Sequence, residues 1–134
     1  MQIKDRKDGQ YFEGEIRLVI NESRILTLTD VSRSEYSDGF GGYFSASDGE
    51  RSIWLGYPKT IEKGTSEDFS YPIDFARSPH MGWVFIENGK QHLIKTGNIT
   101  VSHEPTSNYE GSFDNLSDEN NLNIKGTFEI NWQK

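Results

Sequence analysis

The chemistry-bearing side chains of this chain are mostly carboxylates and amides, and they are densest between Asp114 and Asn121. Asp114, Asp118 and Glu119 place hard oxygen atoms close together, and Ca²⁺ prefers such ligands. The segment lacks the spacing and the final bidentate glutamate of an EF-hand loop. We therefore treat these three residues as a candidate Ca²⁺ site, with a solvated turn between two strands as the alternative.

A second group of residues combines aromatic rings with carboxylates. Exposed rings pack against the CH faces of sugars, while carboxylates accept hydrogen bonds from hydroxyl groups; the same rings can anchor a protein partner. The alternative is that most of these rings form the core, because the chain has few aliphatic residues. The residues that we expect to contact a ligand or partner are Trp54, Tyr57, Phe69, Tyr71, Glu67 and Asp68.

Catalytic signatures are absent from the sequence. There is no cysteine, which excludes thiolate chemistry and disulfides, and no Gly-x-Ser-x-Gly elbow. His80, His92 and His103 show none of the spacings of a zinc site. We expect a protein that is not an enzyme, with Ca²⁺ as the one cofactor that the pattern suggests.

Acidic residues outnumber basic ones, 21 to 14, which gives a net charge of −7. A nucleic-acid-binding protein needs a basic face, so we do not expect nucleic acid as a partner. Negative charge speeds association with basic proteins, and inhibitors or immunity-type factors use it in that way. The alternative is that this charge only supports solubility.

The elements that must position these residues are β-strands, because the dominant hydrophobic period is two. Phe12, Gly14 and Ile16 begin one alternating run that continues to Ile20. The segment Leu122–Trp132 alternates strictly over eleven residues. No window has the 3.6-residue period of an amphipathic helix.

An Asn88-Gly89 pair separates two further β-prone runs and predicts a tight hairpin, because a type I′ turn needs positive φ at both central residues. In this register Glu87 lies opposite Lys90 and Phe85 lies opposite His92. The nine expected strands cover residues 12–20, 25–31, 42–46, 51–57, 82–86, 91–95, 98–103, 109–114 and 122–132.

Short strands separated by polar turns predict an all-β fold, either an antiparallel β-sandwich or a flattened β-barrel. A length of 134 residues suits one domain over residues 1–134. Residues 58–80 hold three of the four prolines and form an expected long loop, with a short edge strand at Tyr71–Ala76.

Three strand segments share a charged residue, a glycine, a polar residue and then a large apolar one. Gly14, Gly111 and Gly126 occupy the glycine position and face inward. We expect the missing side chain to let the strand coil or to let a neighbouring ring lie over it.

These observations favour a binding protein with a protein partner, held by charge complementarity and by aromatic anchors near Tyr57–His80. A carbohydrate-binding module, assisted by Ca²⁺ at residues 114–121, is the alternative, and a small-ligand carrier is a further one. We expect a monomer or weak dimer without a membrane span. Met1–Gln10 is polar, so we expect no Sec signal and either a cytoplasmic location or secretion by another route.

Overall fold

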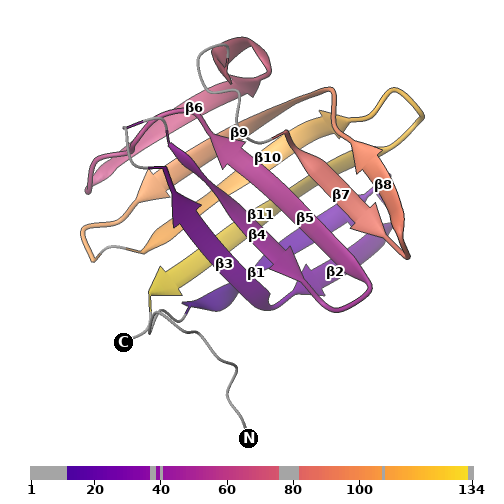
Figure 1. Cartoon of the computed structure of the whole chain (residues 1–134), viewed down its shortest axis with the longest axis horizontal. Coiled ribbons are helices and arrows are strands. Elements are labelled where there is room, and N and C mark those ends of the chain that lie inside the picture. The colour runs from indigo at the N-terminus through magenta and orange to yellow at the C-terminus, as the bar shows by residue number, and fades with distance from the viewer. Residues whose placement is uncertain (1–11, 37–38, 40, 76–81, 107, 133–134) are drawn as a thin grey trace, which may run out of the picture.

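The chain folds into two antiparallel β-sheets, as Figure 1 shows. The structure is a computed structural model, and it describes residues 12–36, 39, 41–75, 82–106 and 108–132. The Met1–Gln10 segment, to which the signal-peptide expectation refers, lies outside these residues, as do Pro79 and His80. The elements are β1 (Phe12–Ile20), β2 (Arg24–Leu28), β3 (Asp30–Glu35), β4 (Gly42–Ser47), β5 (Arg51–Tyr57), β6 (Thr65–Tyr71), the 3₁₀ helix η1 (Ile73–Phe75), β7 (Val84–Glu87), β8 (Lys90–Leu93), β9 (Thr96–His103), β10 (Tyr109–Ser117) and β11 (Asn123–Trp132).

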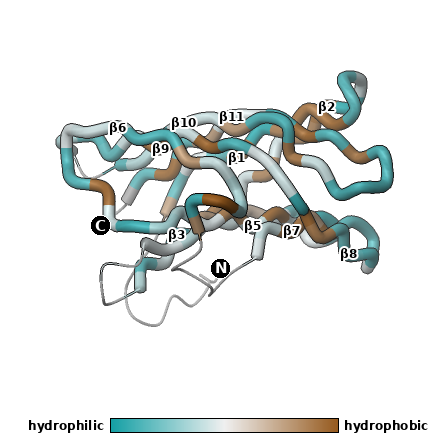
Figure 2. The backbone as a smooth tube through the Cα atoms, turned by 90° about the horizontal axis from the view of Figure 1, so that it is seen from above, coloured by the Kyte–Doolittle hydropathy of each residue, from teal (hydrophilic) through white to brown (hydrophobic). Residues whose placement is uncertain are grey.

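The two sheets form two layers (Figure 2). One has six strands in the order β2-β1-β11-β10-β9-β6, and the other has five in the order β3-β4-β5-β7-β8. Within the described residues the sheets do not close into a barrel, so the arrangement is consistent with a β-sandwich and not with the flattened barrel. The all-β class and the antiparallel pairing that the sequence predicts are confirmed.

The number of strands is eleven within the described residues, which corrects the expected nine. One extra strand comes from the segment Ile25–Val31, which we expected to be continuous. The chain instead leaves β2 at Leu28 and enters β3 in the other sheet at Asp30. Leu28 and Val31 are both fully buried, and three residues apart they could not share one face of a single strand. A crossing between the sheets keeps both side chains inside.

The other extra strand is β6, which lies in the stretch that we expected to be a long loop. The expected edge strand exists at the edge of the six-stranded sheet, but it covers Thr65–Tyr71 and not Tyr71–Ala76. Pro72 follows it and has no N–H group with which to extend the ladder. The chain then turns through η1, where the Asp74 carboxylate accepts a hydrogen bond of 2.7 Å from the Ser70 N–H group.

The predicted hairpin between β7 and β8 is confirmed in its turn and its register. Asn88 and Gly89 both have positive φ, at 51° and 83°. Glu87 lies opposite Lys90, and Phe85 lies opposite His92. This register places His92 on the same side of the sheet as the buried Phe85 ring, which matters for the pocket described below.

Two of the three glycines of the shared frame, Gly111 and Gly126, let aromatic rings lie across the sheet, whereas backbone atoms of Glu129 and Ile130 occupy the space beside Gly14. Gly111 is directly opposite Phe128, and Gly126 is directly opposite Phe113. A Cβ atom added at Gly111 would lie 2.7 Å from Cζ of Phe128, and one at Gly126 would lie 2.7 Å from Cζ of Phe113. Each ring therefore occupies the space that a side chain on the neighbouring strand would need, as the sequence predicts.

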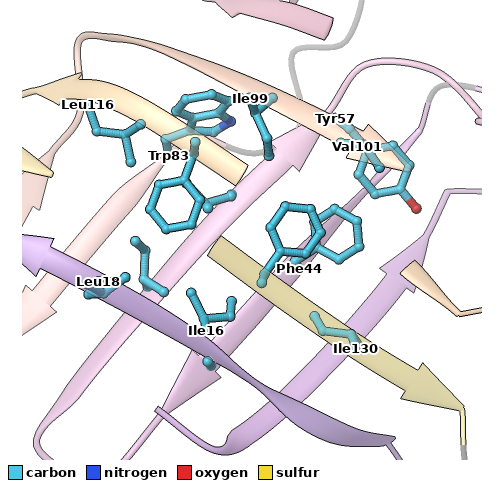
Figure 3. Packing of buried hydrophobic residues seen from close by; sticks show 14 of the residues in the cluster. Ile16, Leu18, Phe44, Tyr57, Trp83, Ile99, Val101, Leu116 and Ile130 are labelled. Atoms are coloured by element: carbon cyan, nitrogen blue, oxygen red, sulfur yellow. The ribbon is translucent and has the colours of Figure 1, made fainter. Parts of the chain in front are cut away.

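Aromatic rings also join the two layers, as the core close-up in Figure 3 shows. Phe44 of the five-stranded sheet lies 4.7 Å from Phe128 and 5.5 Å from Tyr109 of the other sheet, measured between ring centroids. Trp83 is buried and its indole N–H group donates a 3.1 Å hydrogen bond to the Gly56 carbonyl oxygen. The interior is thus filled largely by rings.

A cluster of ion pairs closes one end of the sandwich between the layers. Arg24 on β2 forms two parallel hydrogen bonds of 2.8 and 2.9 Å with the Glu87 carboxylate on β7. Nε of Arg51 lies 3.2 Å from the same carboxylate, and the Arg51 guanidinium also binds Asp48 at 3.0 Å. Hydrogen bonds from Arg24 and then from Arg51 lower the pKa of Glu87 from 4.5 to about 2, against the effect of burial.

We expect Gly126→Ala to lower the free energy of unfolding by about 1–3 kcal/mol, as overpacking commonly does. The new methyl group would clash with the Arg17 carbonyl oxygen and would lie 2.7 Å from the Phe113 ring. Gly82→Ala is the control, because its nearest neighbour is a hydroxyl oxygen 3.5 Å away. Urea titration measures both variants, and equal losses would show that the ring contact at Gly126 does not matter.

Acid should weaken the ionic cluster. Because the folded pKa of Glu87 is about 2 and its ordinary value is 4.5, its contribution to stability is complete above pH 4.5. That contribution is lost as the pH falls from 4.5 towards 2. In denaturant titrations across this range, Glu87→Gln should be less stable than the wild type near neutral pH, and the difference should shrink in acid. Glu13→Gln, a change on an exposed glutamate, should follow the wild-type profile, and an unchanged difference for Glu87→Gln would contradict this assignment.

Candidate functional site

Two of the aromatic residues that we expected to contact a ligand belong to the core. Tyr57 is 1% exposed and Phe69 is 7% exposed. The Tyr57 ring stacks on Phe44 at 4.9 Å, and the Phe69 ring packs against Phe75. These two rings form part of the core, which was the alternative to a binding role, because a chain with few aliphatic residues must fill its interior with aromatic side chains. Burial therefore corrects the assignment of Tyr57 and Phe69 to a binding surface.

The other residues expected near the proline-containing stretch have local partners. Tyr71 is half-buried and stacks on Trp83, with ring centroids 4.4 Å apart and ring planes 10° apart. The Glu67 carboxylate forms a 3.2 Å ion pair with Lys59. The Asp68 carboxylate accepts a 2.7 Å hydrogen bond from a threonine hydroxyl on β9. The structure brings none of these three side chains to Trp54, which lies on the other sheet.

Trp54 is half-buried on the outer face of the five-stranded sheet. Its ring lies 5.3 Å from the Tyr43 ring, and Tyr43 in turn lies 6.2 Å from Tyr36. Val84 is directly opposite Trp54 on β7, and Leu93, which is 55% exposed, is directly opposite Val84 on β8. These five side chains form one aromatic and apolar patch.

We call the outward side of the five-stranded sheet the aromatic face. Alternation along the strands, together with the register between them, fixes its members. Apart from Asp30 at one corner, the strand residues of this face carry no charge. Its uncharged strand residues are Ser32, Ser34, Tyr43, Ser45, Ser47, Ser52, Trp54, Gly56, Val84, Ile86, Gln91 and Leu93.

The outward side of the six-stranded sheet has the opposite character. Glu15, Glu129 and Glu110 lie directly opposite one another on β1, β11 and β10, and we call them the glutamate row. Arg17 forms a 3.5 Å ion pair with Glu15 at one end of the row. Repulsion from Glu104, together with smaller effects of burial and of Glu129, raises the pKa of Glu110. The glutamate row and the half-buried rings of the aromatic face therefore lie on opposite faces of the sandwich.

The candidate Ca²⁺ residues are not assembled into one site. Asp114 lies opposite Asn98, and its carboxylate accepts a 3.3 Å hydrogen bond from that amide. Glu119 is exposed. Asp118 is only 5% exposed, and one of its oxygens accepts hydrogen bonds from the N–H groups of Asn120 and Leu122 at 2.7 and 3.2 Å. In the described part of the chain, no three His, Asp or Glu side chains are placed to hold a metal ion.

Asp118 instead pairs with a histidine that the sequence analysis did not select. Its second oxygen lies 3.3 Å from Nδ1 of His92, and the His92 ring stacks on Phe85 at 6.0 Å. Burial by itself raises the pKa of Asp118, but the N–H groups of Asn120 and Leu122 and the His92 ring outweigh it, and the pKa is lowered. The hairpin register already placed His92 beside Phe85, and that signal could have identified it as an inward residue.

The His92–Asp118 pair forms part of an open pocket of about 530 Å³, which we call the end pocket. It lies between β8, the β10–β11 turn and the β1–β2 turn, at one end of the two layers. Its lining residues are Asn21, Lys90, Gln91, His92, Leu93, Lys95, Asp118, Glu119, Asn120, Asn121 and Leu122. The turn proposed for Ca²⁺ is thus a wall of this pocket.

Comparison with protein-family models, with curated proteins and with solved structures gives no significant match. The described residues include no helix long and apolar enough to cross a membrane. The function is therefore argued from the geometry of the aromatic face, the glutamate row and the end pocket.

Substitutions at Tyr57 test its assignment to the core. Its hydroxyl lies near the Arg33 guanidinium but meets no donor or acceptor among the described residues with hydrogen-bond geometry. Tyr57→Phe should therefore keep the free energy of unfolding or raise it by up to about 1 kcal/mol. Tyr57→Ala should lower it by about 3–5 kcal/mol. Thermal and urea unfolding measure both, and a stable Tyr57→Ala protein would contradict the core assignment.

Proposed function

We propose that this chain is a binding protein that docks a protein partner on its aromatic face. The observation that carries the proposal is the row formed by Trp54, Val84 and Leu93, which lies beside Tyr43 on a nearly uncharged sheet surface. Tyrosine and tryptophan dominate the energetic centres of protein interfaces, where charged residues are depleted. Tyrosine, tryptophan and serine together are also typical of antibody paratopes.

The shape of the patch favours a protein partner over a flat polysaccharide. A sugar chain that stacks on a sheet needs rings in nearly one plane. The Tyr43 and Trp54 rings are inclined at 43° to each other, and Tyr36 and Tyr43 at 54°. Inclined rings offer no single flat stacking surface, whereas the side chains of a protein partner can pack against rings in different orientations. The aromatic face is therefore better suited to a protein partner than to a flat polysaccharide.

Charge has a smaller role in this proposal than the sequence suggested. The glutamate row lies on the opposite sheet, so a partner cannot contact it and Trp54 through one flat interface. Affinity at the aromatic face would come from short-range contacts and would change little with salt. A partner chosen mainly for its positive charge, such as the target of an acidic inhibitor, would bind the glutamate row and would be sensitive to salt.

Pull-down and titration with two sets of variants distinguish these cases. Trp54→Ala and Tyr43→Ser should each weaken binding of the captured partner about 30-fold or more, since loss of an interface centre costs about 2 kcal/mol. Glu129→Gln, on the opposite face, is the matched control and should bind like the wild type. Calorimetry with the purified partner measures all three proteins, and circular dichroism checks that each is folded.

Two outcomes would contradict the proposal. Loss of binding with Glu129→Gln and not with Trp54→Ala would move the interface to the glutamate row. A purified oligosaccharide that binds the wild type and fails to bind Trp54→Ala would show that the aromatic face is a carbohydrate site.

A further inference from the structure

The end pocket offers a second binding chemistry, which does not depend on the proposed function, although Gln91 and Leu93 of its lining also belong to the edge of the aromatic face. It is concave, and its volume of about 530 Å³ falls within the range of small-molecule sites. Three elements that are distant in sequence form its walls, namely the β1–β2 turn, strand β8 and the β10–β11 turn. The aromatic face, by contrast, is an open sheet surface.

The buried carboxylate in the pocket is fully engaged by the protein. Asp118 is the one buried charged residue among the described parts of the chain. Two backbone N–H groups bind one of its oxygens, and Nδ1 of His92 lies 3.3 Å from the other. With Nδ1 directed to Asp118 and the ring stacked on Phe85, the His92 imidazole is held in place. Its Nε2 atom is then the ring nitrogen that can bind a ligand.

Two lysines, Lys90 and Lys95, and two carboxylates, Asp118 and Glu119, line the pocket, so its formal charges balance. Lys90 lies opposite Glu87, but the Glu87 carboxylate already binds Arg24 and Arg51. Within the described residues no ion pair engages the ammonium group of Lys90 or of Lys95. Glu119 is the one lining carboxylate that remains besides Asp118. Because protein donors already bind Asp118, the charged groups left to meet a ligand are two ammonium groups and one carboxylate, which favours a ligand with a single negative charge.

Amide groups supply the remaining polar contacts. Asn21, Gln91, Asn120 and Asn121 all line the pocket, and each side-chain amide can donate and accept hydrogen bonds. The Asn21 side-chain oxygen accepts a 2.8 Å hydrogen bond from the Asn123 N–H group, which holds that side chain in position. Neighbouring hydroxyl groups also donate and accept, so amides match them better than they match a bare anion.

We propose that the end pocket binds a small acidic sugar, a monosaccharide or disaccharide that carries a carboxylate group. Lys90 and Lys95 hold the carboxylate, while the amides and His92 bind the hydroxyl groups. Leu93 and Leu122 provide apolar surface for the CH groups of the ring. A single phosphate or sulfate ion would fill only a small part of the volume and would leave the amides without partners.

The test is an NMR titration of the ¹⁵N-labelled full chain with glucuronic acid, glucose and inorganic phosphate as separate probes. Glucuronic acid should cause saturable shifts in the backbone amides of β8 and of the 118–122 turn. Glucose should bind at least about tenfold more weakly because it lacks the carboxylate, and phosphate should do so because it lacks the sugar ring with its hydroxyl groups.

Lysine variants then test which side chains bind the carboxylate of glucuronic acid. The double variant Lys90→Gln/Lys95→Gln should weaken the binding of glucuronic acid at least about tenfold and leave its weak affinity for glucose unchanged. Lys125→Gln, a change on an exposed lysine of β11, removes one charge from the outer side of the six-stranded sheet, outside the pocket lining, and should bind glucuronic acid like the wild type.

Three results would overturn the proposal. Equal affinity for glucose and glucuronic acid would show that the lysines recognise no carboxylate. Phosphate that binds as tightly as glucuronic acid would identify a site for simple anions. The absence of saturable shifts up to about 20 mM, well above a millimolar Kd, would show that the pocket binds no such sugar.

Discussion

Phe113 and Phe128 each place a ring over a glycine of the neighbouring strand, and the packing of the interior depends on these two ring–glycine contacts. Only 33% of the residues are hydrophobic, while aromatic residues make up 13%, so rings must fill much of the space between the layers. A ring needs more room than one position of a sheet provides. Gly111 and Gly126 provide that room, and the rings can then lie flat enough for Phe44 of the opposite sheet to pack on Phe128.

This core allows the two outer surfaces to differ. Three directly opposed glutamates on one face repel one another, at a cost of about 0.2–1 kcal/mol for each pair. The other face leaves parts of the Trp54 and Tyr43 rings in contact with solvent. A sandwich selected only for stability would have neither feature. The interior and the Arg24–Glu87 contact between the layers stabilise the fold without using either outer face.

The sequence alone could predict those features that depend on local pattern. Alternation identified the long strands, and Asn88-Gly89 specified a hairpin and its register. The crossing between β2 and β3 was missed because each half has an ordinary β pattern, and only the burial of both Leu28 and Val31 reveals the change of sheet. Of the residues expected to bind a partner, Trp54 lies on the proposed surface and Tyr57 lies in the core.

The end pocket was beyond local reasoning, because its key contacts join distant parts of the chain. His92 and Asp118 are 26 residues apart in the sequence. Arg24 and Glu87 are 63 residues apart, and because they bind each other, the Glu87 carboxylate is not left for Lys90.

Among the described residues the sandwich also has strands at the edges of its sheets, and one of them is β6, with Glu67 and Asp68. Joining two copies along this edge would bring these carboxylates close to their own counterparts. These carboxylates therefore work against the polymerisation of the sandwich into a continuous sheet.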